Sequence, residues 1–145
     1  MIRKLAYILI TLGIILVVAS QMHSDSDIIN WGSYSEALKF AKKDNKLIFV
    51  YFYSDNCPYC KSMSSKVFSD ERIAGILNEK FTPVKVNVRV DSDLVKKFVS
   101  SFKEKNMDFV TPSYIIIDSN ERIIDMKVGY LEKSEFEKFI MNVNK

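Results

Sequence analysis

An unbroken apolar and aromatic run, Leu47–Tyr53 (LIFVYFY), is followed after three polar residues by Cys57-Pro58-Tyr59-Cys60. Such a run is typical of a strand buried on both faces, as at the centre of a parallel sheet. Pro58 suits the first turn of a helix, where its missing N–H costs nothing. We therefore predict a central strand, a short loop and a helix that begins at the first cysteine.

Patterns typical of helices and strands alternate along the rest of the chain. Capping residues predict helix starts at four places: Ser33, Ser69-Asp70, Asp91 and Ser134. Apolar residues alternate with polar ones at 84–90 and again at 124–128, which predicts two half-buried strands. Residues 113–117 predict a further strand, which the turn at 118–120 joins to the last one.

The order of predicted elements is α-β-α-β-α-β-β-α. The first two strands are connected through a helix, so they are expected to be parallel with a right-handed crossover. The last two are connected by a short turn, so they are expected to be antiparallel. The predicted fold class is therefore α/β, with a mixed four-stranded sheet and helices on both faces.

The first twenty residues are predicted to lie outside this fold. Two basic residues precede fifteen uncharged, mostly aliphatic ones (5–19), a pattern typical of a secretory signal peptide. An uncleaved membrane anchor is the alternative, although fifteen helical residues span about 22 Å against a hydrocarbon core of about 30 Å. We predict a signal peptide or anchor over 1–20, a polar tether over 21–30 and a folded domain over 31–145.

Both interpretations of the leader export the domain, because the basic head stays inside. We expect a periplasmic protein, or one anchored on the outer side of the cytoplasmic membrane through residues 1–20. The formal net charge is +3, and the two basic residues of the leader account for all but one unit of it. A near-neutral body without a basic stretch argues against nucleic acid as a partner.

The two cysteines carry the predicted chemistry. Cys57 stands at a helix start, where free backbone N–H groups and the helix dipole favour the thiolate. Cys60 lies on the same helix face, with a Cα separation of about 5 Å that a disulfide can bridge. We therefore expect Cys57 to attack disulfides and Cys60 to resolve the mixed disulfide. The redox-active disulfide takes the place of a cofactor, and no metal is predicted.

Other uses of the pair stay open at this point. A zinc site needs further ligands, and the only histidine, His23, lies in the predicted tether. Two thiolates suit two-coordinate Cu(I), so a copper-binding or copper-delivery protein is one alternative. A non-catalytic binding module with a structural disulfide is another, although so small a loop constrains the unfolded chain little.

From about residue 31 to 145, the chain resembles the thioredoxin-like superfamily. The matching pieces are LIFVYFY, CPYCK, the strand VKVNV, Thr111-Pro112 entering a strand, and Val128-Gly129-Tyr130 before the last helix. The Gly-Gly-acid segment of glutaredoxins has no counterpart here. The chain is more similar to exported, Dsb-type thiol–disulfide oxidoreductases, which implies that it reduces or exchanges protein disulfides.

The resemblance also implies roles for residues around the pair. Pro112 is expected to be the cis-proline beside the cysteines. This leaves the backbone of Thr111 free to pair with an extended substrate segment. Tyr59, between the cysteines, is expected to be exposed and to contact the substrate. Thioredoxins place a buried acid six residues before the first cysteine, where this chain has Tyr51. Lys85 matches the lysine beside that acid. Lys85 and the Tyr51 hydroxyl are therefore candidates for assisting proton transfer from the resolving thiol.

The implied partners are proteins that carry disulfides or thiols, and a membrane electron donor if the protein is a reductase. No dimerisation segment is visible in the sequence, which favours a monomer. The sequence leaves open whether the protein acts as a reductase, an oxidase or an isomerase, and on which substrate.

Overall fold

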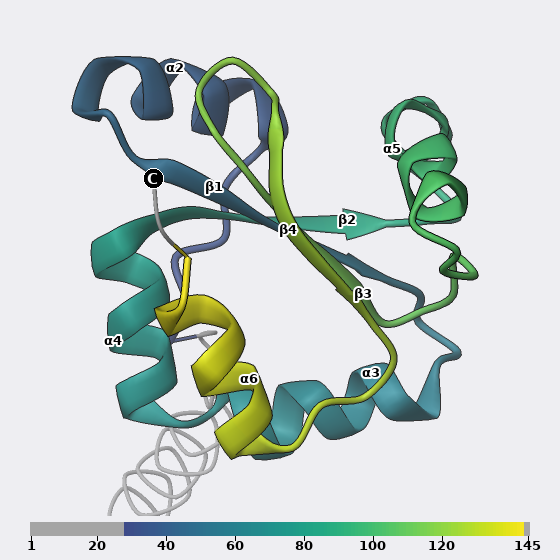
Figure 1. The fold of residues 1–145 in the computed structure, drawn as a ribbon. Helices are drawn as coiled ribbons and strands as arrows, with labels where there is room; N and C mark the ends of the chain where they lie inside the picture. The colour runs from purple at the N-terminus through teal and green to yellow at the C-terminus, as the bar shows by residue number, and fades with distance from the viewer. Residues whose placement is uncertain (1–27, 144–145) are drawn as a thin grey trace, which may run out of the picture.

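The computed structural model describes residues 28–143. The predicted signal peptide or anchor (1–20) and most of the predicted tether therefore lie outside the described residues. The described part is a four-stranded sheet in the order β2-β1-β3-β4, with helices on both faces (Figure 1). The predicted fold class and element order are confirmed.

The bounds of the elements follow the sequence patterns closely. The strands are β1 (Leu47–Tyr53), β2 (Phe81–Asn87), β3 (Ser113–Ile117) and β4 (Ile123–Val128). The helices are α2 (Tyr34–Asp44), α3 (Pro58–Met63), the π-helix η1 (Ser64–Phe68), α4 (Glu71–Lys80), α5 (Ser92–Glu104) and α6 (Lys133–Met141). β1 pairs with β2 in parallel and with β3 antiparallel, and β3 and β4 form an antiparallel hairpin.

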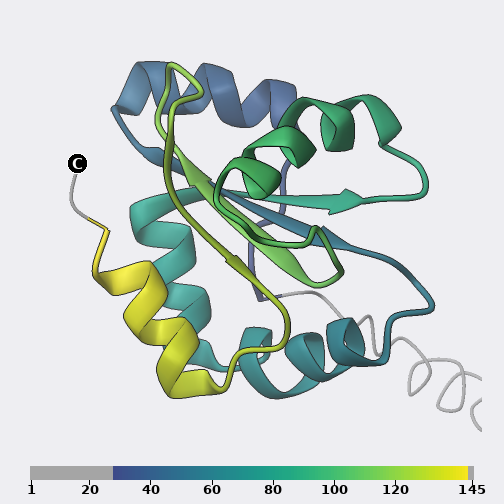
Figure 2. The ribbon, with the colours of Figure 1, turned by 45° about the vertical axis from the view of Figure 1, so that its right-hand side comes forward.

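β1 lies at the centre of the molecule and is covered on both faces, which explains its unbroken apolar run. Phe49 and Tyr51 belong to the core cluster on the side of α3, η1, α4 and α6. Ile48, Val50 and Phe52 belong to the cluster on the side of α2 and α5. Figure 2 shows these two layers of helices on opposite sides of the sheet.

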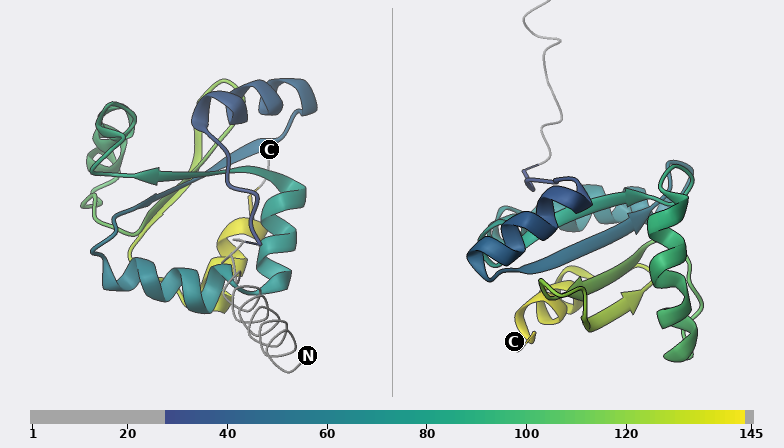
Figure 3. Two further views of the ribbon diagram at one scale, coloured as in Figure 1. Left: turned by 180° about the vertical axis from the view of Figure 1, so that it is seen from behind. Right: turned by 90° about the horizontal axis from the view of Figure 1, so that it is seen from above.

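The connection from β1 to β2 places the cysteines. It runs through α3, η1 and α4 on one face of the sheet, and the view from behind shows these helices along the same side (Figure 3). Because β1 ends at Tyr53 and α3 begins at Pro58, Cys57 stands just beyond the end of the central strand.

β2 ends earlier than the alternation at 84–90 predicts, so Val88 and Val90 lie beyond it. The chain turns there because the Asn87 N–H donates to the Asp91 carboxylate at 3.2 Å and the Asp91 N–H donates to the Asn87 carbonyl at 2.9 Å. Val90 is left 75% exposed. Asp91 occupies the predicted cap position of α5, but its side chain caps no N–H of that helix.

The predicted capping box at Ser134 is also wrong. The residue before α6 is Glu132, whose N–H donates to the Glu135 carboxylate at 3.2 Å, and Ser134 lies inside the first turn. Glutamate is an uncommon capping residue, so the pattern favoured the serine two positions later.

Ile124 of β4 is exposed, whereas the predicted alternation places it among the buried residues of the strand. The pairing with β3 shifts between Ile116 and Ile117, which places Ile123 opposite Ile117 and Asp125 opposite Ile116. Ile124 falls between these pairs and is 37% exposed. A bulge of this kind adds one residue to a strand and reverses the facing of its neighbours.

The packed part of the chain begins before Trp31. Ile29 is 2% exposed and belongs to the core. The Asn78 side chain accepts from the Asn30 N–H at 2.9 Å and donates to the Ile28 carbonyl at 3.0 Å. Residues 28–30, which the sequence places in the tether, therefore lie against α4.

Glu121, in the β3–β4 turn, connects three elements and generates a prediction about acid stability. It accepts from the Tyr34 hydroxyl of α2 at 2.6 Å and pairs with Lys97 of α5. The hydrogen bonds from Lys97 and Tyr34 hold the pKa of Glu121 below its usual value. A carboxyl with a lowered folded-state pKa stabilises the fold above its unfolded-state pKa, and this contribution is lost as the pH falls through the folded value.

We therefore expect Glu121→Gln to unfold with a shallower pH dependence than the parent protein below about pH 5. Urea unfolding at pH 7, 5, 4 and 3 measures this. Glu104→Gln, which removes an exposed acid at the end of α5, is the matched control and should follow the parent. Parallel curves for Glu121→Gln and the parent would show that the turn contributes nothing to acid stability.

Candidate active site

Cys57 and Cys60 form a disulfide with a Cα separation of 5.2 Å. Cys57 is the N-cap of α3 and Pro58 occupies its first turn, as the sequence predicts. The Cys60 N–H points at the Cys57 sulfur, with a distance of 3.0 Å between nitrogen and Sγ. A sulfur in this position receives a backbone donor and faces the positive end of the helix, which favours its anionic form.

The loop before β3 lies directly beside the pair. The Thr111–Pro112 peptide bond is cis, as the resemblance implies. The Thr111 carbonyl oxygen lies 3.4 Å from Cys57 Sγ, and the Pro112 carbonyl accepts from the Gly129 N–H at 2.7 Å. Thr111 and Pro112 are thus brought to the cysteines, while their contact with a substrate stays a prediction.

Two apolar side chains are exposed next to this loop and the cysteines. Tyr59, between the cysteines, is 64% exposed, and Val110, immediately before Thr111, is 49% exposed. Tyr59 is predicted from the sequence as a substrate contact, whereas Val110 is not. The only signal for Val110 is its position before Thr111-Pro112, and that signal depends on recognising the loop.

Tyr51, the residue in the place of the thioredoxin acid, is fully buried. Its hydroxyl donates to the Cys60 carbonyl at 3.5 Å. Four rings surround it, with centroid distances of 4.9 to 5.9 Å: Phe68, Tyr114, Tyr53 and Trp31. Burial raises the pKa of the Tyr51 hydroxyl, and the nearby Tyr53 adds to this. The hydroxyl therefore keeps its proton at neutral pH. It can take part in proton transfer only as a neutral hydrogen-bonding group, not as a phenolate base.

Tyr114 is a fully buried residue of β3 for which the sequence predicts no role at the site. It pairs with Tyr51 across β1 and β3, and the two rings stack with an interplanar angle of 13°. Within the described residues its hydroxyl has no hydrogen-bond partner, and burial raises its pKa. The pairing register that joins these two tyrosines is a tertiary feature, so the sequence carries no local signal for it.

Lys85 lies beside Tyr51 on the neighbouring strand, opposite it in the β1–β2 register. Its Nζ is 4.9 Å from the centroid of the Tyr53 ring and 6.0 Å from that of Trp31. Cations favour the faces of aromatic rings at such distances. Aromatic rings thus hold the lysine ammonium group on the same side of the sheet as the cysteines.

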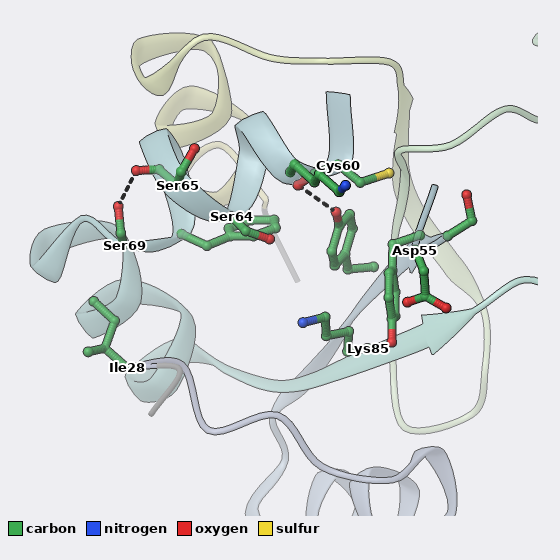
Figure 4. A pocket seen from close by; sticks show the side chains of 12 residues that line it. Ile28, Asp55, Cys60, Ser64, Ser65, Ser69 and Lys85 are labelled. Carbon is green, nitrogen blue, oxygen red and sulfur yellow. Dashed lines mark hydrogen bonds between the residues drawn. The ribbon is translucent and has the colours of Figure 1, made fainter. Parts of the chain in front are cut away.

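A pocket of about 510 Å³ opens between these residues. Tyr51, Cys60 and Lys85 all line it, together with hydroxyl groups from η1 and from the loop after β1 (Figure 4). The structure therefore brings Cys60 and both candidates for proton transfer to one pocket, while the roles of all three residues stay predictions.

Within residues 28–143, His, Cys, Asp and Glu side chains form no group of three or more that is suited to hold a metal ion. Over the same range, no helix combines the length and the apolar character needed to cross a membrane.

Solved structures with the same arrangement define the fold as that of thioredoxin. A thioredoxin from Thermus thermophilus superposes with a TM-score of 0.63 at 24% identity, covering 79% of this chain and 86% of that one. A putative disulphide-isomerase from Bacteroides thetaiotaomicron gives 0.63 at 24% identity, with coverage of 84% and 100%. A DsbH oxidoreductase gives 0.59 at 18% identity, with coverage of 80% and 86%.

The chain belongs to the thioredoxin-like domain family, whose model matches residues 34–144. The rat spermatogenesis-associated protein 20 (Rattus norvegicus) is 35% identical over 78 residues, which are 54% of this chain and 10% of that protein. The chain thus spans about a tenth of this curated relative. An uncharacterized protein of Archaeoglobus fulgidus is 27% identical over 85 residues, which are 58% of this chain and 67% of that protein.

The aromatic surroundings of Tyr51 predict that an acid is not tolerated there. We expect Tyr51→Asp to lower the free energy of unfolding by at least about 3 kcal/mol, because it leaves a cavity and buries a carboxyl among rings. Tyr51→Phe should cost less than about 1 kcal/mol, because it removes one long hydrogen bond. Urea unfolding of the oxidised proteins measures both values. A Tyr51→Asp protein as stable as its parent would contradict this view of the site.

Proposed function

We propose that this protein is a thiol–disulfide oxidoreductase that reduces or exchanges protein disulfides through Cys57 and Cys60. The observation that carries the proposal is the disulfide between the N-cap of α3 and the residue three positions on, beside the Thr111 carbonyl. The fold shared with a thioredoxin and a DsbH oxidoreductase supports it.

The chemistry begins with the reduced pair. The Cys57 thiolate, which the Cys60 N–H and the other N–H groups at the start of α3 stabilise, attacks one sulfur of a substrate disulfide. That bond breaks, and its electron pair leaves on the other substrate sulfur. Cys60, as a thiolate, then attacks Cys57 Sγ and expels the first substrate sulfur. The two protons of the protein thiols end on the two substrate thiols, and the same steps in reverse oxidise a substrate.

The proton of Cys60 needs a route, since the position of the thioredoxin acid holds a neutral tyrosine. Cys60 and Lys85 line the same pocket, and the Tyr51 hydroxyl reaches the Cys60 carbonyl. We propose that water in this pocket takes the proton, with Lys85 and Tyr51 ordering that water.

The polypeptide substrate is proposed to dock on the loop that carries Thr111. An extended segment that adds to the backbone at Thr111 passes directly over Cys57, whose sulfur is 3.4 Å from the Thr111 carbonyl oxygen. Tyr59 and Val110 offer apolar contact on this surface.

The cellular setting completes the proposal. The charged head and apolar stretch of residues 1–19 support export, so the domain would act in the periplasm or on the outer side of the cytoplasmic membrane. Proteins with disulfides or thiols are the proposed substrates, a membrane electron donor is the proposed source of reducing equivalents, and the protein is proposed to act as a monomer.

Cysteine variants separate the two steps. With Cys60→Ser the first step still occurs but the second does not, so mixed disulfides with substrate proteins should accumulate. Cys57→Ser should form no such species with proteins and should lose insulin reduction. Nonreducing gels and an insulin precipitation assay measure the two outcomes.

The fold of Cys57→Ser should persist because serine is a preferred N-cap residue. Circular dichroism at matched concentration checks this. If both variants reduce insulin at the rate of the parent protein, the proposed function is wrong.

Substitution of the exposed tyrosine tests the docking surface. Tyr59→Ser should raise the KM for insulin about five-fold, as expected for the loss of one apolar contact worth about 1 kcal/mol. The turnover of a small neutral disulfide should not change. Phe40→Ser is the matched control, because Phe40 is 53% exposed on α2, away from the cysteines. Equal KM values for both variants would remove Tyr59 from the docking surface.

A further inference from the structure

We propose that Ser113, the first residue of β3, is a positioning residue for polypeptide substrates, and that its buried hydroxyl fixes the loop 110–112 beside Cys57. The inference rests on the proposed redox function of the cysteine pair and deepens it. It assigns to one side chain the task of holding the backbone at Thr111 in the orientation that an extended substrate needs.

Ser113 is a polar residue in an apolar position. Its side chain is 0% exposed, and within residues 28–143 no other buried residue carries a polar side chain, apart from tyrosines and cysteines. Its neighbours across the sheet are Phe52 of β1 and Val128 of β4, which are part of, or pack against, the core cluster on the side of α2 and α5. A buried hydroxyl costs stability unless it is hydrogen-bonded, so the bond that it makes indicates its use.

The Ser113 hydroxyl bonds to the loop before the strand. It donates to the carbonyl of Val110, three residues earlier in the chain. Serine side chains form bonds of this kind to nearby backbone carbonyls in place of regular secondary structure. Residues 107–110 belong to no helix or strand, so no regular element fixes the backbone at Val110. The bond from Ser113 ties this backbone to the sheet.

Two further contacts hold the other residues of the loop. The Pro112 carbonyl accepts from the Gly129 N–H at 2.7 Å. The Thr111 hydroxyl lies 3.5 Å from the hydroxyl of Ser54, and either group can be the donor. The loop is thus held from β3, from the residue after β4 and from the loop after β1. The contact from Ser113 differs from the other two because it comes from a fully buried side chain.

The reacting sulfur lies against the segment that is held in this way. Cys57 Sγ is 3.4 Å from the Thr111 carbonyl oxygen. A strand that adds to the backbone at Thr111 gains its hydrogen bonds only when that backbone has the right orientation, and ordering a loose loop on binding costs affinity. Because Ser113 fixes the carbonyl just before Thr111, the loop is ordered before the substrate arrives. Ser113 therefore acts on the substrate through the loop.

The size of the substrate separates this role from a general structural one. A polypeptide pairs with the backbone at Thr111, whereas a small disulfide has no backbone segment to place there. Loss of the Ser113 hydroxyl should therefore slow the reaction with a polypeptide disulfide and leave the reaction with a small disulfide unchanged. A side chain that only stabilises the fold would affect both reactions alike.

The test compares two variants whose side chains have the same shape. Ser113→Thr keeps the hydroxyl and Ser113→Val replaces it with a methyl group, so any strain from the larger side chain is common to both. The reduced full-length proteins are mixed with insulin or with hydroxyethyl disulfide. Maleimide trapping and mass spectrometry give the second-order rate constants for oxidation of the cysteine pair. The ratio of the insulin to the hydroxyethyl disulfide rate constant cancels changes in the intrinsic reactivity of Cys57.

We expect Ser113→Thr to keep the ratio of the parent protein within two-fold. Ser113→Val should lower the ratio about five-fold, the change expected for the loss of one hydrogen bond. Ser113→Ala cannot clash and should show the same loss, so the test stands even if the larger side chains do not fit. Thr82→Val is the matched control and should keep the parent ratio. It removes a hydroxyl from β2 opposite the start of β1, whereas the cysteines lie beyond the end of β1.

A Ser113→Ala protein with the parent ratio would overturn the inference, and so would folded Ser113→Thr and Ser113→Val proteins with equal ratios. Rate constants that fall equally with both disulfides would show a general structural role and would also overturn it. In these cases a parent protein that reduces insulin retains the proposed function and loses only this inference. A parent protein that does not reduce insulin loses both.

Discussion

The contact between the Cys60 N–H and Cys57 Sγ, at 3.0 Å, is the interaction on which the site depends. It exists because a strand buried on both faces ends just before the cap of α3, so the first sulfur meets the unpaired donors of a helix start. The same helical turn places the second cysteine within disulfide range. Local helix geometry thus places a backbone donor at the first sulfur and brings the second sulfur within reach of it.

Tyr51 stands beside this pair at the position where the resemblance to thioredoxins leads us to expect a buried acid. Tyr51 replaces a buried acid with an aromatic ring that stacks on Tyr114 and packs against Phe68. The site therefore has rings, where thioredoxins have a carboxyl, next to Cys60. The pocket that opens beside Tyr51 and Lys85 is lined by polar side chains from η1 and from the loop after β1.

The sequence predicts those features of the fold that local patterns determine. The buried run of β1, the helix start at Cys57 and the β3–β4 hairpin are confirmed because burial, capping and turn length act over a few residues. The ends of elements are less predictable. The Asn87–Asp91 turn and the bulge at Ile124 depend on side-chain and cross-strand contacts that no periodicity records.

The same distinction applies to the site. The cysteine pair follows from spacing, and the cis bond at Pro112 follows from the resemblance to thioredoxins. Tyr114, Val110 and the pocket do not follow from either, because tertiary packing assembles them from separate elements. Tyr51 is singled out only because a family pattern expects a different residue there.

The most direct measurement of the central claim is the pH dependence of alkylation in the reduced protein. Iodoacetamide reacts with thiolates, and mass spectrometry of peptides reports each cysteine separately. If the helix start stabilises the first thiolate, Cys57 reacts ahead of Cys60, with a midpoint pH well below the value of about 8.5 for an ordinary thiol. Equal rates at the two cysteines, or a midpoint for Cys57 at the ordinary value, would contradict the account.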